Sequence, residues 1–295
     1  MMVKLVILFY FSLLFVNSQK LYSKTIFVYN NNENKEDTVL HKYKNYDYKL
    51  LKLALDKTIP LYGEYELIPS EKMNKKRAIY TAKENKIKNF ILNASASDDL
   101  LLGNLIYANV PTQRGSYGYR IAFISPNLEN HPEKYDTLEK IKNLIIGQGV
   151  GWLDIDILKF HNFNVISCPN NESTCLMLAK NRIDIYLQGI LQVKKQLERN
   201  KEMNLRYEKS FLIYYPLPKF FFTHKSNKAA IKRIEEGLKM AFDDGSFNRL
   251  FNIEFKKNMS IINMKNMKIY RLTNPYIRNF DSSYEKYNIK LENYR

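Results

Sequence analysis

The chain has 295 residues, of which 45% are hydrophobic and 14% are aromatic. These fractions exclude an intrinsically disordered chain and allow one large domain or two lobes of ordinary size. The formal net charge of +16 would suit an anionic partner, but the lysines are spread along the whole chain. Because no recognition helix, zinc finger or RNA-binding signature accompanies them, we predict no nucleic-acid partner.

The first residues are typical of an export signal. Lys4 supplies a positive start, residues 5–16 are mostly apolar, and residues 16–18 resemble a small-residue cleavage site. The apolar run is shorter than the roughly twenty residues of a membrane-spanning helix. We therefore predict a signal peptide over residues 1–18 and a soluble mature protein that is periplasmic or otherwise exported. The alternative is an N-terminal anchor that stays uncleaved.

The N-terminal third alternates strand patterns with helix patterns. Apolar and β-branched runs predict strands, and apolar residues at helical spacing predict helices. Residues 93–103 interrupt the alternation with small polar groups. The expected strands are 25–29, 65–69, 89–92, 105–110 and 121–125, and the expected helices are 48–57 and 71–86.

The alternation continues through residues 143–189, where the most glycine-rich turn of the chain occurs. Strands joined by crossover helices imply a parallel sheet, with sites in the loops at the carboxyl ends of its strands. A glycine-rich loop that enters a helix exposes backbone N–H groups to a ligand's negative charge. This pattern favours small-molecule binding. We expect strands at 144–146, 164–166 and 183–187, helices at 152–160 and 172–180, and a loop containing Gly147, Gly149 and Gly151.

The last third contains two expected helices and a long segment without periodicity. A charged helix is expected over residues 192–206 and an amphipathic one over 229–242. Between them, the aromatic run 211–222 is interrupted by two prolines and is typical of a strand that leads into a connection. Residues 256–295 are expected to form an extended tail.

The cysteine and histidine content predicts neither a metal site nor a cofactor. The four histidines are scattered, and no HExxH or paired-cysteine spacing occurs. Cys168 and Cys175 lie close in sequence, so an oxidising compartment would allow a disulfide between them. The alternative is two small hydrophobic side chains that pack separately.

The sequence also lacks the motifs of common enzyme classes. The GQGVG run at residues 147–151 lacks the Gly-Lys-Ser/Thr ending of a phosphate loop and the GxGxxG spacing of a dinucleotide fingerprint. No GxSxG or Ser/His/Asp arrangement is present, and the paired aspartates lie at turns. We therefore predict that the chain is not an enzyme.

The order of these parts resembles the type II periplasmic solute-binding proteins, in their amino-acid-ABC-transporter-like group (the family 3 solute-binding domain). The resemblance covers residues 20–255 and rests on the order of several loosely matching segments. These are residues 138–154 at the start of the second lobe, 178–184 near the cleft, 214–223 at the return crossing, and 231–251 in the closing helices, with the turn Asp244-Gly245-Ser246.

The resemblance implies an α/β fold of two lobes, each a mixed sheet flanked by helices, with a ligand cleft between them. It assigns residues 19–122 and 219–255 to lobe one and 123–218 to lobe two, and leaves 256–295 as a C-terminal extension. It implies a monomer that closes around a small polar solute, an amino acid or related anion, for uptake through a membrane permease. The alternative is a sensor or interaction protein that keeps the fold without transporting a solute.

The family usually carries an arginine that holds a substrate carboxylate, just after a small-residue stretch of lobe one. Here the stretch 93–99 contains two aspartates and no arginine. Arg114 either substitutes for it or forms an ion pair at the surface or hinge. Trp152 either stacks on a ligand or anchors lobe packing. Asp154 and Asp156 either stabilise the start of a helix or contact the ligand. The candidate ligand-binding residues are Tyr29, Asn30, Ser95, Ser97, Arg114, Gln148, Gly149, Val150, Gly151, Trp152, Gln188 and Gly189.

Overall fold

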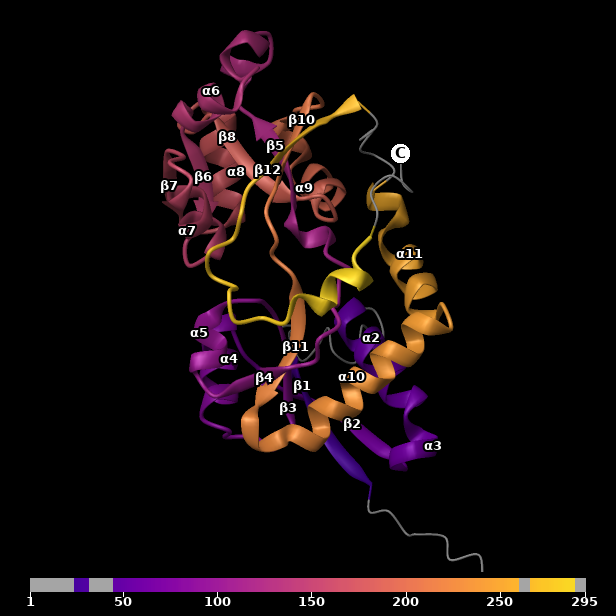
Figure 1. Cartoon of the computed structure of the whole chain (residues 1–295). Coiled ribbons are helices and arrows are strands. Elements are labelled where there is room, and N and C mark those ends of the chain that lie inside the picture. Colours follow the sequence, from indigo (N-terminus) through magenta and orange to yellow (C-terminus); the bar gives the residue numbers. More distant parts are fainter. Residues whose placement is uncertain (1–23, 32–44, 260–265, 290–295) are drawn as a thin grey trace, which may run out of the picture.

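The computed structural model describes residues 24–31, 45–259 and 266–289, so the predicted signal peptide lies outside the described residues. The chain forms two lobes, and each lobe has its own sheet with helices packed against it (Figure 1). The expected two-lobed α/β architecture is therefore confirmed.

The first sheet has five strands in the order β2-β1-β3-β11-β4. Strand β1 pairs in parallel with β2 and β3, whereas β11 is antiparallel to β3 and β4, so the sheet is mixed. The strands are β1 (Thr25–Asn31), β2 (Tyr65–Lys72), β3 (Phe90–Ser95), β4 (Leu105–Tyr107) and β11 (Lys219–His224), and the helices are α2 (Tyr46–Lys57), α3 (Ile59–Tyr62), α4 (Lys75–Lys83), α5 (Asp98–Leu102) and α10 (Lys228–Asp243).

The second sheet has seven strands, six of them in the order β12-β10-β5-β8-β6-β7, with β9 paired to β5. Strand β6 is parallel to β7 and β8, which confirms the parallel crossover units expected over residues 143–189. The strands are β5 (Tyr119–Ile124), β6 (Ile146–Gly149), β7 (Val165–Cys168), β8 (Ile185–Gly189), β9 (Arg206–Tyr207), β10 (Phe211–Tyr214) and β12 (Lys268–Arg271), and the helices are α6 (Leu138–Asn143), α7 (Leu153–Phe160), α8 (Asn171–Ala179) and α9 (Val193–Arg199). Helix α11 (Ser246–Met259) follows α10 and packs against α10 and α2 of the first lobe as well as against α9 of the second.

The glycine-rich turn differs from its prediction. Gly147 and Gly149 belong to strand β6, where they pair with Ile166 and Cys168 of β7, so the loop begins only at Val150. The close packing of this strand explains the glycines, because a Cβ on Gly147 would lie 2.4 Å from Ile183 Cδ1. Glycine here makes room for neighbouring side chains inside a sheet.

The helical face of the first lobe follows the predicted amphipathic pattern. Helix α10 buries Ile231, Ile234 and Leu238 against the lobe and packs along α2. At their crossing Gly237 has no space for a side chain, since a Cβ there would lie 1.9 Å from the carbonyl oxygen of Ala54. The two backbones are therefore in direct contact.

The chain passes between the sheets more often than the sequence indicated. Strand β5 lies wholly in the second sheet, so the first crossing precedes Tyr119, a few residues before the expected boundary at residue 122. The second crossing connects β10 to β11. The segment expected as a tail also crosses, since β12 pairs in parallel with β10 and the 3-10 helix η7 (Ser282–Tyr287) packs on the first lobe.

The returning segment, residues 272–289, forms a strap across both lobes, which Figure 1 shows in yellow. On the second lobe the Leu272 N–H donates to the Tyr214 carbonyl at 2.7 Å. On the first lobe Phe280 stacks on Phe220, with ring centroids 5.8 Å apart. The Ile289 N–H then donates to the Arg114 carbonyl at 2.9 Å. The strap therefore joins the two lobes through backbone contacts and buried aromatic rings.

Asp98 is the main polar anchor of this strap. Its carboxylate accepts the backbone N–H groups of Arg278 at 3.1 Å and Asn279 at 3.0 Å. Its own N–H donates to the Tyr276 carbonyl at 2.7 Å. Asp98 thus fastens the C-terminal segment to the first lobe.

Replacing Asp98 by alanine should lower the free energy of unfolding by about 2 kcal/mol, because two solvent-exposed hydrogen bonds of about 1 kcal/mol each are lost. Limited proteolysis should then cut the strap faster than in the wild type, and urea unfolding should report the loss of stability. The control is Asp99→Ala, since Asp99 is an exposed residue in the same turn of α5. Equal behaviour of the two variants would contradict the anchoring role.

No helix among the described residues has both the length and the apolar character required to span a bilayer.

Candidate functional site

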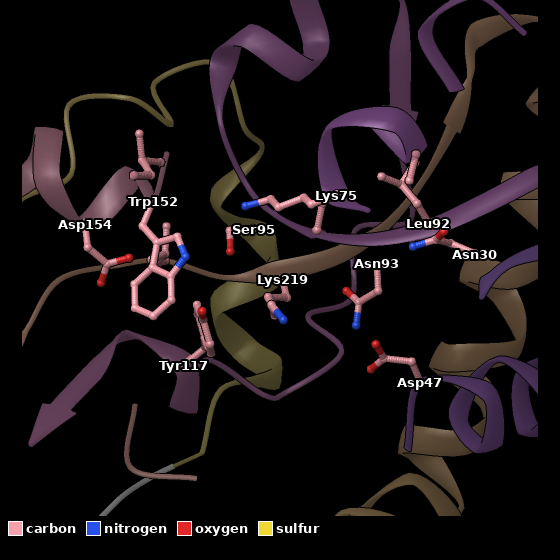
Figure 2. Close-up of a pocket in the computed structure, with 14 residues that line it drawn as sticks. Asn30, Asp47, Lys75, Leu92, Asn93, Ser95, Tyr117, Trp152, Asp154 and Lys219 are labelled. Atoms are coloured by element: carbon pink, nitrogen blue, oxygen red, sulfur yellow. The ribbon is translucent and has the colours of Figure 1, made fainter. Parts of the chain in front are cut away.

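A cavity of about 260 Å³ lies between the two sheets. Strands β1, β3 and β11 and helices α2 and α4 contribute one wall, and η1 (Ser116–Gly118) and the start of α7 contribute the other (Figure 2). The cavity thus draws on both lobes, as a ligand cleft between lobes requires. Its lining residues are Asn30, Asp47, Lys75, Ala78, Leu92, Asn93, Ala94, Ser95, Tyr117, Trp152, Leu153, Asp154, Leu217 and Lys219.

The floor of the first wall is formed by neighbouring strands β3 and β11. Lys219 pairs with Ser95 in the antiparallel register, and Asn93 lies two residues before Ser95. Since side chains alternate along a strand, these three project from the same face of the sheet. Asn93 is held in place by Thr112, whose Oγ1 donates to Asn93 Oδ1 at 3.1 Å.

Asn93 also offers an unused hydrogen-bond donor to the cavity. Its Nδ2 is shielded from solvent and has no hydrogen-bond partner within the described chain. A buried donor without an acceptor is costly, so a bound solute with an acceptor atom would be stabilised here. This observation supports a polar ligand at the site.

Two helices begin at the edge of the first wall. Lys75 is the first residue of α4, and Asp47 lies in the first turn of α2. Asn45 caps α2 by accepting the Asp47 N–H at 2.9 Å, which fixes the start of that helix beside the cavity. A cation and an anion therefore face the same space from different helices.

The second wall presents aromatic rings. Tyr117 and Trp152 line the cavity from η1 and from the residue before α7. The ring of Trp152 lies over Gly149, where an added Cβ would come within 2.5 Å of the indole. The glycine of β6 therefore allows the tryptophan to lie flat on the strand and turn toward the cleft.

Behind these rings lies a buried ionic cluster formed by Arg120, Asp154 and Tyr215. Arg120 and Asp154 are 3% and 4% exposed, and their Nη2 and Oδ1 atoms are 2.8 Å apart. The Tyr215 hydroxyl donates to Asp154 Oδ1 at 2.5 Å and accepts from Arg120 Nε at 3.1 Å. Burial and the neighbouring carboxylate raise the pKa of Tyr215. This cluster neutralises Asp154 internally.

Only some of the residues predicted to bind a ligand line the cavity. Asn30, Ser95 and Trp152 line the cavity, and Tyr29 lines a smaller adjoining hollow of about 30 Å³ beside Asn30. Ser97 precedes α5 and is not among the cavity-lining residues.

The predicted glycine-loop residues lie behind or outside the cavity lining. Gln148 is fully buried and its Nε2 donates to the Leu187 carbonyl at 3.1 Å. Val150 is 63% exposed, and Gly151 has a φ of 75° in the turn before α7. Gln188 Nε2 donates to the Tyr186 hydroxyl, and Gly149 and Gly189 adjoin the Trp152 ring and the Arg120 guanidinium.

Arg114 lies away from the cavity lining and contacts the strap. Its Nε donates to the Tyr287 carbonyl at 3.3 Å, and its guanidinium lies 5.6 Å from the Phe242 ring and 5.7 Å from the Phe251 ring. Its backbone has a φ of 49°. The side chain therefore packs at the base of the C-terminal segment.

The two cysteines are free and buried in the structure, so the separately packed arrangement is the one found. Cys168 Sγ contacts Met177 Sδ at 3.8 Å, and Gln196 Nε2 donates to Cys175 Sγ at 3.3 Å. Burial raises the pKa of Cys175 to about 11. Each thiol thus has its own partner in the second lobe.

The sequence did not single out several residues that line the cavity, namely Asp47, Lys75, Asn93, Tyr117 and Lys219. Asn93 belonged to the noted stretch 93–99, but its orientation depended on the pairing of β3 with β11. Lysines are so abundant in this chain that no local signal distinguishes Lys75 or Lys219. Within the described ranges, no group of His, Cys, Asp and Glu residues could hold a metal ion.

Comparison with known proteins gives structural matches only. No family model and no curated sequence matches the chain. The probable amino-acid ABC transporter extracellular-binding protein YtmK from Bacillus subtilis superposes with a TM-score of 0.61 at 15% identity, covering 79% of this chain and 98% of its own. An ancestral arginine-binding protein bound to arginine gives 0.56 at 14% identity, covering 79% and 99%.

A histidine kinase sensor domain with similarity to periplasmic binding proteins gives a TM-score of 0.57 at 12% identity, covering 79% of this chain and 96% of its own. At sequence identities this low, the superpositions establish a shared fold and nothing about the ligand. These neighbours have the two-lobed architecture described above, so the expected fold is confirmed.

Proposed function

We propose that this chain, which has the type II periplasmic-binding-protein fold, is an exported receptor that closes its two lobes around a small polar solute for uptake. The cavity between the lobes carries the proposal, because it combines aromatic rings, amide groups and charged side chains drawn from distant parts of the sequence. Small-molecule sites typically combine an apolar wall with a few polar groups that point into the cavity.

The proposed solute is an amino acid or a related anion. Asn93 offers a buried donor, and Trp152 and Tyr117 offer flat surfaces for a small ligand. The size of the cavity, about 260 Å³, suits a ligand of a few heavy atoms. A membrane permease would receive the solute from the receptor, which we propose acts as a monomer after removal of residues 1–18.

We propose a binding role and no catalysis. The Arg120–Asp154–Tyr215 cluster has its charges satisfied internally, and the described residues that line the cavity include no nucleophile hydrogen-bonded to a base. A measurable hydrolytic or redox turnover of the solute by the purified protein would overturn this part.

A sensor role is the second candidate, and the likeness to a histidine kinase sensor domain favours it. The strap over both lobes adds a further reason, because it gives the receptor an extra surface that spans the moving parts. Binding to a transport permease in membrane vesicles would support uptake, whereas binding to a kinase would support sensing.

Thermal-shift screening of the purified mature protein tests the binding proposal. Amino acids, organic acids, sugars and polyamines would each be added at millimolar concentration. A ligand at one hundred times its Kd should stabilise the folded state by about 2.7 kcal/mol, which is a shift of a few degrees. Failure of every class to shift the melting temperature of a folded sample would overturn the proposal.

A further inference from the structure

The cavity contains positive charges that the protein itself does not neutralise. Lys219 extends from β11 and Lys75 from α4 toward the space between Trp152 and Asn93 (Figure 2). Neither lysine forms an ion pair with a carboxylate of the described chain, although lysines elsewhere in it do. Lys219 Nζ instead lies 4.7 Å from the centre of the Tyr117 ring.

The acidic groups of the cavity divide into one neutralised and one available carboxylate. Asp154 is neutralised by Arg120 at 2.8 Å. Asp47 lines the opposite side of the cavity and forms no ion pair with a described residue. Two ammonium groups and one carboxylate therefore face the cavity without an ion-pair partner among the described residues.

A solute that complements this set carries two negative groups and one positive group. In this structure Lys75 is exposed and Lys219 and Asp47 are half-buried. Closure of the lobes would remove these side chains from solvent, and each charge then left unmatched would be costly. A basic amino acid would place a second cation beside the lysines, and a neutral one would leave a lysine unpaired. The stretch 93–99 beside the cavity provides no other cation, because it contains neither lysine nor arginine.

We propose that the site selects an acidic amino acid, and that Lys219 and Lys75 bind its carboxylates while Asp47 binds its ammonium group. This assignment rests on the proposed solute-binding function and adds the class of solute. Lys219 is the central residue, because its position beside Ser95 and over Tyr117 fixes it within the cleft.

Isothermal titration calorimetry of the full mature chain with glutamate, aspartate, glutarate, glutamine and arginine tests the proposal. Glutamate or aspartate should bind, and Lys219→Gln should weaken that binding by about 10- to 100-fold, as expected for the loss of a charge-assisted hydrogen bond. Lys75→Gln should weaken it as well. Lys219→Arg keeps the charge and should retain most of the affinity.

Lys76→Gln is the matched control, since Lys76 is the next residue of α4, is exposed and does not line the cavity. The Lys76→Gln variant should bind glutamate or aspartate with the same affinity as the wild type. Circular dichroism and melting of each unliganded variant separate lost binding from lost folding.

Tighter binding of glutamine or arginine than of glutamate would overturn the charge assignment while leaving the binding function intact. Equal binding of glutarate and glutamate would overturn the role of Asp47. No binding of any amino acid or other solute in the broader thermal-shift screen would instead remove the proposed function itself, so the two failures are distinguishable.

Discussion

Replacing Asp154 by alanine should lower the free energy of unfolding by about 3–5 kcal/mol, because it leaves the buried Arg120 guanidinium without its counter-ion. Burial lowers the pKa of Arg120, whereas the neighbouring Asp154 and Tyr215 raise it overall. Without Asp154 the guanidinium still keeps its charge, because an arginine side chain does not lose its proton in proteins. Urea unfolding of the ligand-free protein measures the effect.

Asp156→Ala is the control, since Asp156 lies on the same helix α7 and is exposed. Its removal should cost less than about 1 kcal/mol, the scale of a helix-dipole interaction. The double replacement Arg120→Met with Asp154→Leu should recover much of the loss, because it removes both buried charges together. A single Asp154→Ala variant as stable as the wild type would contradict the ion-pair account.

Replacing Gly237 by alanine should lower the free energy of unfolding by about 3 kcal/mol, the upper range for overpacking a core. Helix propensity alone predicts the opposite sign, since alanine within a helix is favoured over glycine by about 1 kcal/mol. The contact with α2 makes the substitution destabilising, because the new Cβ would lie 1.9 Å from the Ala54 carbonyl oxygen. Helix α10 must then move away from α2. Thermal and urea unfolding measure the change.

Gly245→Ala provides a matched comparison at the end of the same helix. Gly245 has a φ of 76°, and its added Cβ would have Arg249 Nη1 at 3.5 Å as its nearest neighbour. The substitution should therefore cost only the strain of a left-handed backbone, about 1–2 kcal/mol. If Gly245→Ala proved more damaging than Gly237→Ala, backbone strain and not helix contact would dominate at this corner of lobe one.

The strap changes how the lobes of this chain can move. The chain passes between the sheets before β5 and after β10, and again to reach β12 and to return through residues 272–289. A rotation of one lobe against the other must therefore bend or slide the strap as well as the hinge. Asp98, which anchors the strap, lies three residues after strand β3 of the cavity wall. A movement of the strap can therefore be transmitted to the cavity wall through Asp98.

Much of the fold could be predicted from local patterns. Apolar periodicity located strands such as β1 and β5 and helices such as α2 and α7, and the amphipathic pattern of residues 229–242 matches helix α10 closely. It did not predict α5, β9 or β12. The order of these elements indicated two lobes, which the structure confirms. These predictions succeed because a helix or strand that buries one face needs apolar residues at its own spacing, and this spacing can be read from neighbouring residues in the sequence.

The functional geometry depended on contacts that local patterns do not encode. Ser95 was chosen for its hydroxyl, but its neighbour Lys219 is brought beside it only by the pairing of β3 with β11. Asp154 was interpreted as a charge at the start of a helix, whereas the structure pairs this residue of α7 with Arg120 of strand β5.

The class of fold follows from local sequence, because the periods of the hydrophobic residues match strands and helices in a fixed order. The tertiary structure decided which charged groups share the cleft and which are neutralised, since Coulomb interactions act between residues distant along the chain. It likewise turned an aperiodic tail into a strap, because Asp98 and residues 276–279 meet only after the lobes have folded.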